Sequence, residues 1–143
     1  MTRLLAFDYG RRRIGVATGN TVSHTAQAIA TLPAAAHGPD WRRIEELIRE
    51  WRAEALVVGL PLQLDGAESD ACRNARRFGG ELNRRFALPV AYVDERYSST
   101  AADQLLRETA ESDKSLTGKR KSRRDALAAE LILGTYFEQT SHS

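Results

Sequence analysis

A hairpin signature near the amino terminus constrains the fold more than any other feature of this sequence. Two short apolar runs, Leu4–Asp8 and Ile14–Thr18, flank a connection that contains Gly10. Such an arrangement is typical of two adjacent antiparallel strands. Gln27–Leu32, which ends before Pro33, supplies a third strand to the same sheet. The chain is therefore predicted to begin with three antiparallel strands.

The remainder of the chain alternates between helical and strand patterns. Ala55–Gly59 and Val90–Val93 are short continuous apolar runs, which is typical of strands that are covered on both faces. The predicted helices, which follow from apolar residues at helical spacing, are Asp40–Arg52, Glu68–Phe86, Thr100–Thr109 and Asp125–Phe137. The polar segment Ala110–Ser122 is predicted to be a loop. Three antiparallel strands followed by two βα units predict a mixed α/β sheet with helices on both faces.

Length and composition limit the class of protein. The 143 residues suffice for one domain, 1–143 with an ordered core of about 3–137, and 42% hydrophobic with 28% charged residues is a globular composition. The sequence shows neither an apolar run of membrane-spanning length nor a signal-peptide pattern, so we expect a cytoplasmic protein. Cys72 is the single cysteine, and with three histidines it gives no zinc-ligand spacing.

An aspartate ends the first predicted strand, which otherwise has the pattern of a buried strand. Taken alone, Asp8 would be a turn residue, because Asp commonly closes strands by bonding to the turn backbone. Two more acids, Asp94 and Glu95, follow the strand Val90–Val93, at the carboxyl end where open α/β sheets tend to place their sites. Asp125 begins the last predicted helix. Candidate site carboxylates therefore come from three separate elements.

Asp125 has two interpretations. With Ser122 it fits a capping box, and an acid in the first turn of a helix suits the helix dipole. It also lies at helical spacing from Ala129, Ile132 and Tyr136, the stripe that is expected to pack on the sheet. The sequence alone leaves both open.

Carboxylates that are brought together repel one another and lose hydration, which a bound cation would offset. Oxygen ligands with no His or Cys at hand suit Mg²⁺ or Mn²⁺. Such a cluster beside arginines is suited to hydrolysing a phosphodiester, because metal ions position water and neutralise developing charge. The residues therefore favour a metal-dependent nuclease.

Basic residues cluster near these acids in the sequence. Arg11–Arg13 occupy the first turn, and Lys119–Arg124 (KRKSRR) carries five positive charges in six residues. Charge runs are usually solvated surface, but the nearness to Asp8 and Asp125 favours contact with a nucleic-acid backbone. The residues expected to bind nucleic acid are Arg11, Arg12, Arg13, Arg96, Lys119, Arg120, Lys121, Arg123 and Arg124. Arg96 either contacts the scissile phosphate or pairs with a neighbouring acid.

Four ordered motifs, FDYGRRRIGVATG, VVGLP, DERYSST and RRDALAAELIL, resemble those of the YqgF family. Its members are ribonuclease-H-like proteins regarded as pre-16S rRNA nucleases and related to Holliday-junction resolvases. The resemblance runs from about Arg3 to Phe137. It departs from the family at Arg124, where an aliphatic residue is usual, and at Tyr97-Ser98-Ser99, which replaces Leu-Thr-Thr. Neither departure removes a carboxylate.

The resemblance implies a ribonuclease-H-like fold with a five-stranded mixed sheet in the order 3-2-1-4-5. It also implies a catalytic, metal-binding site of Asp8, Glu95 and Asp125, with Mg²⁺ or Mn²⁺ as the cofactor. The implied reaction is hydrolysis of phosphodiester bonds in processing the 5′ end of pre-16S rRNA during ribosome biogenesis. Pre-rRNA is the expected partner ahead of branched DNA, with a pre-ribosomal particle as a further partner, no membrane, and a monomer or homodimer.

Two alternative functions stay open: a Holliday-junction resolvase-like DNA endonuclease, and an RNA-binding assembly factor without catalysis. A nucleotide-binding enzyme fits less well. Gly10 and Gly15 have the spacing of a Walker A loop, but Val16 and Ala17 stand where Lys and Ser or Thr are needed. Sugar kinases and actin share an Asp-x-Gly hairpin, yet they clamp ATP between two lobes, and 143 residues provide no second lobe.

Overall fold

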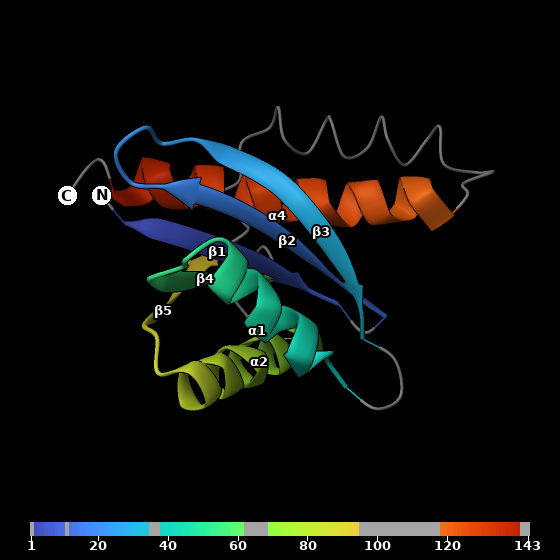
Figure 1. Ribbon diagram of the computed structural model, residues 1–143. Helices are drawn as coiled ribbons and strands as arrows, with labels where there is room; N and C mark the ends of the chain where they lie inside the picture. Colours follow the sequence, from blue (N-terminus) through green and yellow to red (C-terminus); the bar gives the residue numbers. More distant parts are fainter. Residues whose placement is uncertain (1, 11, 35–37, 62–68, 95–117, 141–143) are drawn as a thin grey trace.

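Five strands form one mixed sheet in the order β3-β2-β1-β4-β5 (Figure 1). The computed structural model describes residues 2–10, 12–34, 38–61, 69–94 and 118–140. The strands are β1 (Arg3–Tyr9), β2 (Arg13–Asn20), β3 (Ala26–Pro33), β4 (Ala55–Leu60) and β5 (Val90–Asp94). β1, β2 and β3 pair antiparallel, whereas β4 pairs parallel with β1 and β5 pairs parallel with β4. The predicted strand order and mixed pairing are both confirmed.

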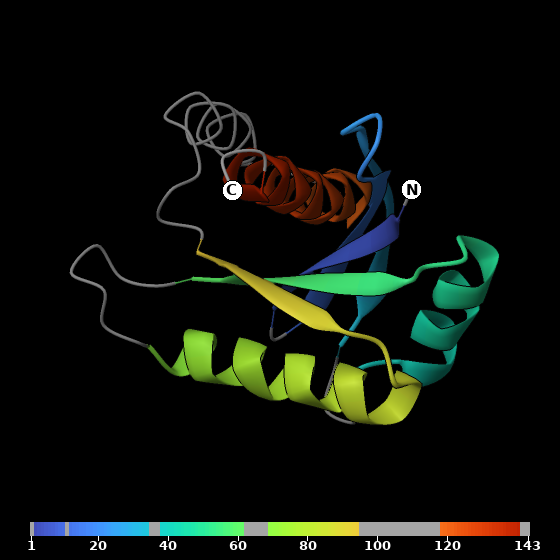
Figure 2. The same cartoon turned by 90° about the vertical axis from the view of Figure 1, so that its left-hand side faces the viewer.

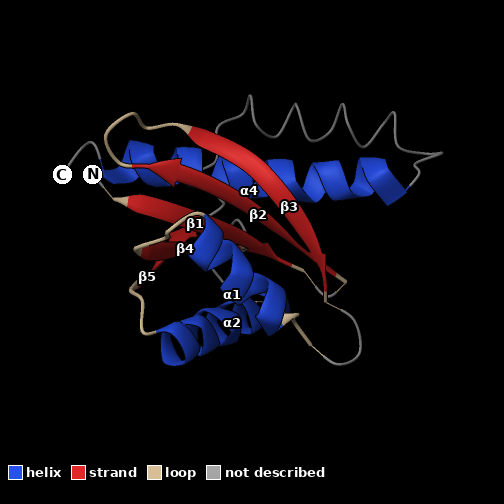
Figure 3. Cartoon of the chain, in the orientation of Figure 1, coloured by secondary structure: helices blue, strands red, loops and turns tan. Residues whose placement is uncertain are grey.

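Helices cover both faces of this sheet, as the sequence predicted. α1 (Trp41–Glu50) and α2 (Asp70–Phe86) lie on one face, and α4 (Gly118–Thr140) lies on the other (Figure 2, Figure 3). The helix predicted over Thr100–Thr109 falls outside the described residues. Among the residues that the structure describes, no helix combines the length and the apolar character that crossing a membrane requires.

The two helices on the first face begin at side-chain caps. Asp40 accepts a hydrogen bond from the Arg43 amide at 3.1 Å, and Ser69 accepts one from the Cys72 amide at 3.3 Å. Each cap satisfies an amide that the first turn of a helix leaves without an intrahelical partner. The predicted start of α1 at Asp40 is thereby explained by its side chain.

Large side chains fill the core between the sheet and the α1/α2 layer. The Phe7 ring meets the edge of Phe78 with centroids 5.6 Å apart, and both side chains are buried. Aliphatic residues complete this core: Leu5, Ile14, Val16, Leu32, Ile44, Leu47, Leu56, Val58, Leu60 and Leu82. Burial of so many large apolar groups is the main source of stability on this face.

The core beneath α4 is built differently, because alanines occupy its centre. Ala6 on β1, Ala17 on β2 and Ala129 on α4 are all fully buried. Larger members surround them: Leu4, Val57, Val93, Ile132, Leu133 and Phe137. Small side chains on both sides let the helix axis lie close to the sheet, and α4 contacts all five strands.

The start of α4 differs from the sequence prediction, whereas the extent of α2 agrees with it. α4 begins at Gly118, so the prediction of a loop through Ser122 and a helix start at Asp125 was wrong. The basic run was taken for loop because it is polar, but Lys and Arg are strong helix formers. α2 runs from Asp70 to Phe86 without a break, as predicted, and Gly79 within it makes room for a neighbour, since a Cβ there would lie 2.7 Å from Tyr92 Cε1.

Candidate active site

Asp8 lies within β1 and faces α4. Leu4 and Ala6 belong to the core under α4, whereas Leu5 and Phe7 belong to the core under α1 and α2. Because side chains alternate along a strand, Asp8 shares the α4 face, where it is half-buried. Its backbone pairs with Gly15 of β2, and the strand continues beyond it. Asp8 is therefore a residue of the sheet, and the interpretation as a turn residue was wrong.

The register of the parallel strands places the end of β5 near Asp8. Phe7 pairs with Val58, and Val58 pairs with Tyr92, so the next residues, Asp8 and Val93, lie at one level of the sheet. Only β4 separates β1 from β5. Two strand spacings amount to about 10 Å, so the carboxyl end of β5 lies within reach of a group bound at Asp8.

Of the two acids at the carboxyl end of β5, Asp94 and Glu95, the structure describes Asp94. Val93 belongs to the core under α4, whereas the Tyr92 hydroxyl donates to the Arg76 carbonyl of α2 at 3.4 Å. Alternation therefore puts Asp94 on the α2 face of the sheet, the face opposite Asp8. Glu95 lies outside the described residues.

The path of α4 brings the backbone of Asp125 level with Asp8. Gly19, which pairs with Leu4, lies against the Leu133 side chain, so Leu133 marks the level of Leu4. α4 runs opposite to β1 (Figure 1). From Leu133 back to Asp125 the helix advances about 12 Å. From Leu4 to Asp8 the strand advances about 13 Å, so the two acids belong to the same level of the molecule.

The position of Asp125 within α4 tests its capping-box interpretation. The helix begins seven residues earlier, at Gly118, and its first turn contains no acid. Ser122 is itself inside the helix, so the capping-box interpretation was wrong. Ala129 and Ile132, which share a helical stripe with Asp125, are buried against the sheet. The Asp125 side chain lies outside the described part of the structure.

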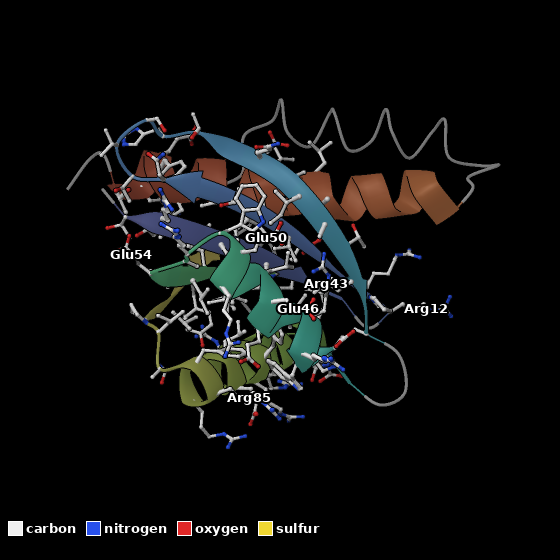
Figure 4. All side chains as sticks on the ribbon, viewed as in Figure 1. Arg12, Arg43, Glu46, Glu50, Glu54 and Arg85 are labelled. Carbon is white, nitrogen blue, oxygen red and sulfur yellow. The ribbon has the colours of Figure 1, made fainter. Side chains whose placement is uncertain are left out.

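The residues predicted to bind nucleic acid lie at the β1–β2 turn and in the first turns of α4, except for two that lie outside the described residues. Arg12 is exposed at the β1–β2 turn, where Figure 4 shows it projecting from the end of the sheet, and Arg13 is half-buried at the start of β2. Gly10 permits this tight turn, since a Cβ there would lie 2.7 Å from the Arg13 carbonyl oxygen. Arg11 and Arg96 lie outside the described residues.

The basic run lies in the first two turns of α4 and is helical. Its predicted nucleic-acid-binding members are Lys119, Arg120, Lys121, Arg123 and Arg124, and their side chains are outside the described part. Along a helix, Lys119 and Arg123 are one turn apart, as are Arg120 and Arg124. Like charges at this spacing repel, and positive charge at a helix amino terminus is unfavourable. Both penalties would be relieved by a bound polyanion.

A divalent cation fits the chemistry of the predicted donors. Within the described side chains, no group of three or more His, Cys, Asp or Glu could hold a metal. Asp8 is the one predicted ligand whose side chain is described, and its carboxylate is half-buried. Oxygen donors are the ligands that Mg²⁺ and Mn²⁺ prefer.

A cavity beside the candidate site was not indicated by the sequence patterns. Tyr9 and Asn74 line it on the α2 face of the sheet. For Tyr9 a signal existed, because strand alternation turns the residue after Asp8 to the opposite face. For Asn74 no sequence signal existed, since a single amide on a helix is ordinarily solvated.

Comparison with known proteins decides the family. A family model described as "RuvX: Holliday junction resolvase" matches residues 2–139. The chain belongs to the RuvX family. This confirms the resemblance of the four motifs to the YqgF group, and it places the chain in a family of nucleases.

Individual relatives agree over nearly the full length. A protein of Burkholderia vietnamiensis named "Putative pre-16S rRNA nuclease" is 46% identical over 96% of this chain and 89% of its own length. A protein of the same name from Chromohalobacter salexigens is 47% identical over 94% of this chain and 88% of its own.

Solved structures share the fold at low sequence identity. T. thermophilus RuvC in complex with a Holliday junction substrate aligns over 99% of this chain and 96% of its own, with a TM-score of 0.55 and 14% identity. The fowlpox virus resolvase in its Holliday junction complex aligns with a TM-score of 0.52 over 97% of this chain and 99% of its own, at 10% identity. The predicted ribonuclease-H-like fold is confirmed by these likenesses.

Proposed function

We propose that this chain is a metal-dependent nuclease that hydrolyses phosphodiester bonds in pre-16S rRNA, in processing of its 5′ end. The observation that carries the proposal is the common level of Asp8, the backbone of Asp125 and the end of β5, on the α4 side of the sheet. Relatives at 46% and 47% identity are named for that substrate. A pre-ribosomal particle in the cytoplasm is the corresponding partner.

The three candidate acids are proposed to act as metal ligands. Asp8, Glu95 and Asp125 hold one or two Mg²⁺ or Mn²⁺ ions through their carboxylate oxygens. When bound, such an ion activates water as a nucleophile and offsets the charge that develops on the phosphate. Asp8 has a fixed position because both neighbouring strands pair with β1.

The basic residues hold the nucleic-acid backbone. Arg12 and Arg13 at the β1–β2 turn, with the first two turns of α4, bring positive charge to the end of the sheet that carries Asp8 (Figure 1). Arg96 directly follows Glu95 in the sequence and contacts the scissile phosphate. Such contacts set the register of the substrate without reading its sequence.

A DNA junction is the second candidate substrate, and the family description favours it. The experiment compares cleavage of labelled RNA carrying the 5′ extension of pre-16S rRNA with cleavage of a four-way DNA junction, each with Mg²⁺ or Mn²⁺. We expect RNA cleavage by the parent and a loss of about a hundredfold or more in Asp8→Asn, because metal-assisted charge stabilisation is worth several kcal/mol.

Asp94→Asn is the matched control, because Asp94 is a nearby carboxylate on the opposite face of the sheet. It should cleave like the parent. If the parent cleaved the DNA junction but not the RNA, the proposed substrate would be a DNA junction and not pre-16S rRNA. If Asp8→Asn cleaved either substrate at the parental rate, the three-acid site would be wrong.

A further inference from the structure

Two neighbouring pockets lie on the α2 face of the sheet, behind the candidate site, and we refer to them as the larger and the smaller chamber of a cavity. The larger chamber has a volume of about 380 Å³ and the smaller about 120 Å³, and both are lined by Tyr9 and Asn74. Gly10, Ser69, Asp70 and Ala71 complete the larger chamber. The cavity therefore starts at the carboxyl end of β1, one residue after Asp8, but on the opposite face.

Aromatic contacts form the floor of this cavity. Phe78 stacks with Tyr9, with ring centroids 4.8 Å apart and planes 27° apart, and with Trp41 at 5.6 Å and 25°. The Arg85 guanidinium lies over the Trp41 ring, 4.3 Å from its centroid. These contacts run from Arg85 through Trp41 and Phe78 to Tyr9. Tyr9 is the end of this series that lines both chambers, so a further flat ring would extend the stack there.

Charge on α2 favours an anionic occupant. The helix carries five arginines against two acids, Asp70 and Glu81. Both acids are already paired: Asp70 with Arg73, and Glu81 with Arg84 and Arg85 at 2.6 and 3.0 Å. These two guanidinium groups lower the pKa of the Glu81 carboxyl, so it stays ionised and paired.

Arg77 differs from the paired arginines of the helix. It lines the smaller chamber and forms no ion pair with any described residue. Asn74, half-buried between the chambers, offers both a donor and an acceptor. A flat stacking surface, an amide and an available guanidinium together match one nucleotide: its base, its base edge and its phosphate.

We propose that this cavity binds a single-stranded flank of the nucleic-acid substrate, with an unpaired base stacked on Tyr9, Asn74 at the base edge and Arg77 at the phosphate. The inference rests on the proposed nuclease function, since the substrate strand would pass around the carboxyl end of β1, where Asp8 and Tyr9 face opposite sides of the sheet. A duplex cannot enter in this way because its bases are already stacked and paired. Aromatic platforms beside positive charge are the usual means of binding unpaired strands.

The test measures binding without cleavage. Fluorescence anisotropy in EDTA compares a labelled single-stranded RNA oligonucleotide with a blunt RNA duplex of the same length. The parent should bind the single strand more tightly. Tyr9→Leu should weaken that binding about tenfold, whereas Tyr9→Phe, which keeps the ring, should bind like the parent.

Two variants on α2 test the same site without changing Tyr9, whose replacement could reduce the stability of the protein. Asn74→Ala should weaken binding of the single strand, and Arg77→Gln should weaken it and reduce the salt dependence by about 0.7 in logarithmic slope. Arg42→Gln is the matched control, because it removes one positive charge from a side chain that is 91% exposed on α1, outside the cavity. It should bind the single strand more tightly than Arg77→Gln does.

The outcomes separate this inference from the nuclease itself. If Arg77→Gln and Asn74→Ala bind like Arg42→Gln while Asp8→Asn loses cleavage, the cavity is not a strand site and the proposed function stands. If the cavity variants lose single-strand binding and the parent cleaves nothing, the strand site stands and the nuclease proposal fails. Equal losses for single strand and duplex would overturn the preference for unpaired strands.

Discussion

The two faces of the sheet are packed in different ways. Under α1 and α2, large side chains such as Phe7, Phe78 and Ile14 fill the core, whereas Ala6 and Ala17 lie at the centre of the core under α4. The first face buries more apolar volume per residue and therefore contributes more to stability. The second face brings a helix close to the sheet at the level of the candidate acids. The larger apolar core and the candidate residue Asp8 thus lie on opposite faces of the sheet.

The largest effect should come from the face with large side chains. Leu82→Ala removes a fully buried side chain of α2 and should reduce the free energy of unfolding by about 2–5 kcal/mol. Urea unfolding measures this change. Cleavage per folded molecule should be unchanged, because α4 and β1 keep their positions. A loss of cleavage as large as the loss of stability would show that the two faces are not separate in function.

The alanine face should respond to added volume. Ala129→Leu inserts a larger group where α4 meets the sheet, and overpacking should reduce stability by about 1–3 kcal/mol. Because the helix must move away from β1, cleavage should fall by more than the loss of folded protein explains. Ala128→Leu is the control, since Ala128 is only half-buried. If both variants cleave like the parent, close approach of α4 is not needed for the chemistry.

The basic turns of α4 should contribute to binding rather than to stability. Replacing Lys119, Arg120 and Lys121 with Gln should weaken nucleic-acid binding about tenfold and reduce the salt slope by about 2, as expected for three lost phosphate contacts. The control replaces Arg42, Arg43 and Arg49, which pair with acids on α1. Both variants lose the same net charge. Equal slopes for the two would mean that total charge, not its place on α4, governs binding.

The α4 face should also show the repulsion that a cation relieves. In chelator, clustered carboxylates raise at least one pKa, and an acid whose folded pKa is raised reduces stability above its unfolded pKa. Asp125→Asn should therefore be more stable than the parent at neutral pH by about 1 kcal/mol. Mg²⁺ should stabilise the parent more, because a ligand of the folded state shifts unfolding. Calorimetry of both proteins tests this. A variant that melts lower in chelator, with the metal response of the parent, would leave Asp125 a structural role.

The smallest effect should come from exposed charge on α2. The Arg84 and Arg85 guanidinium groups lower the pKa of Glu81 below its ordinary value of 4.5. A lowered pKa stabilises the folded state above the unfolded value, and the stabilisation is lost as pH falls through the folded value. Glu81→Gln should thus melt slightly lower at neutral pH and equal the parent in acid. Salt at 1 M should remove the difference as well, since it screens exposed pairs. A difference that persists in acid would need a cause other than charge.

Sequence patterns predicted the sheet better than the helix ends. β1, β2 and β4 bury Leu4 to Phe7, Ile14 to Ala17 and Leu56 to Leu60, so their apolar runs directly reflect their position. The start of α4 was missed because composition alone does not separate a polar helical turn from a polar loop. Lys and Arg are common in both.

For the candidate site, the sequence predicted which residues to consider, and the structure showed how far along the sheet each described one lies. Asp8 stood out because a carboxylate ends an apolar run, and register then aligned it with the end of β5. No pattern within one segment reveals that alignment, since it depends on pairing between distant strands. The placement of Asp94 on the opposite face likewise required knowledge of which helix Tyr92 contacts.

The contact between Gly79 and Tyr92 joins α2 to β5 on one face of the sheet. The Tyr92 ring, which belongs to β5, lies where a side chain at position 79 would be. β5 ends at Asp94, directly before the candidate ligand Glu95 in the sequence, so the strand that precedes this candidate contacts α2 on the face opposite Asp8. In a library of single substitutions selected for activity, position 79 should therefore accept fewer side chains than its neighbour, because the Tyr92 ring must shift to admit a Cβ. Gly80, whose added Cβ would meet nothing within 4 Å, should accept many.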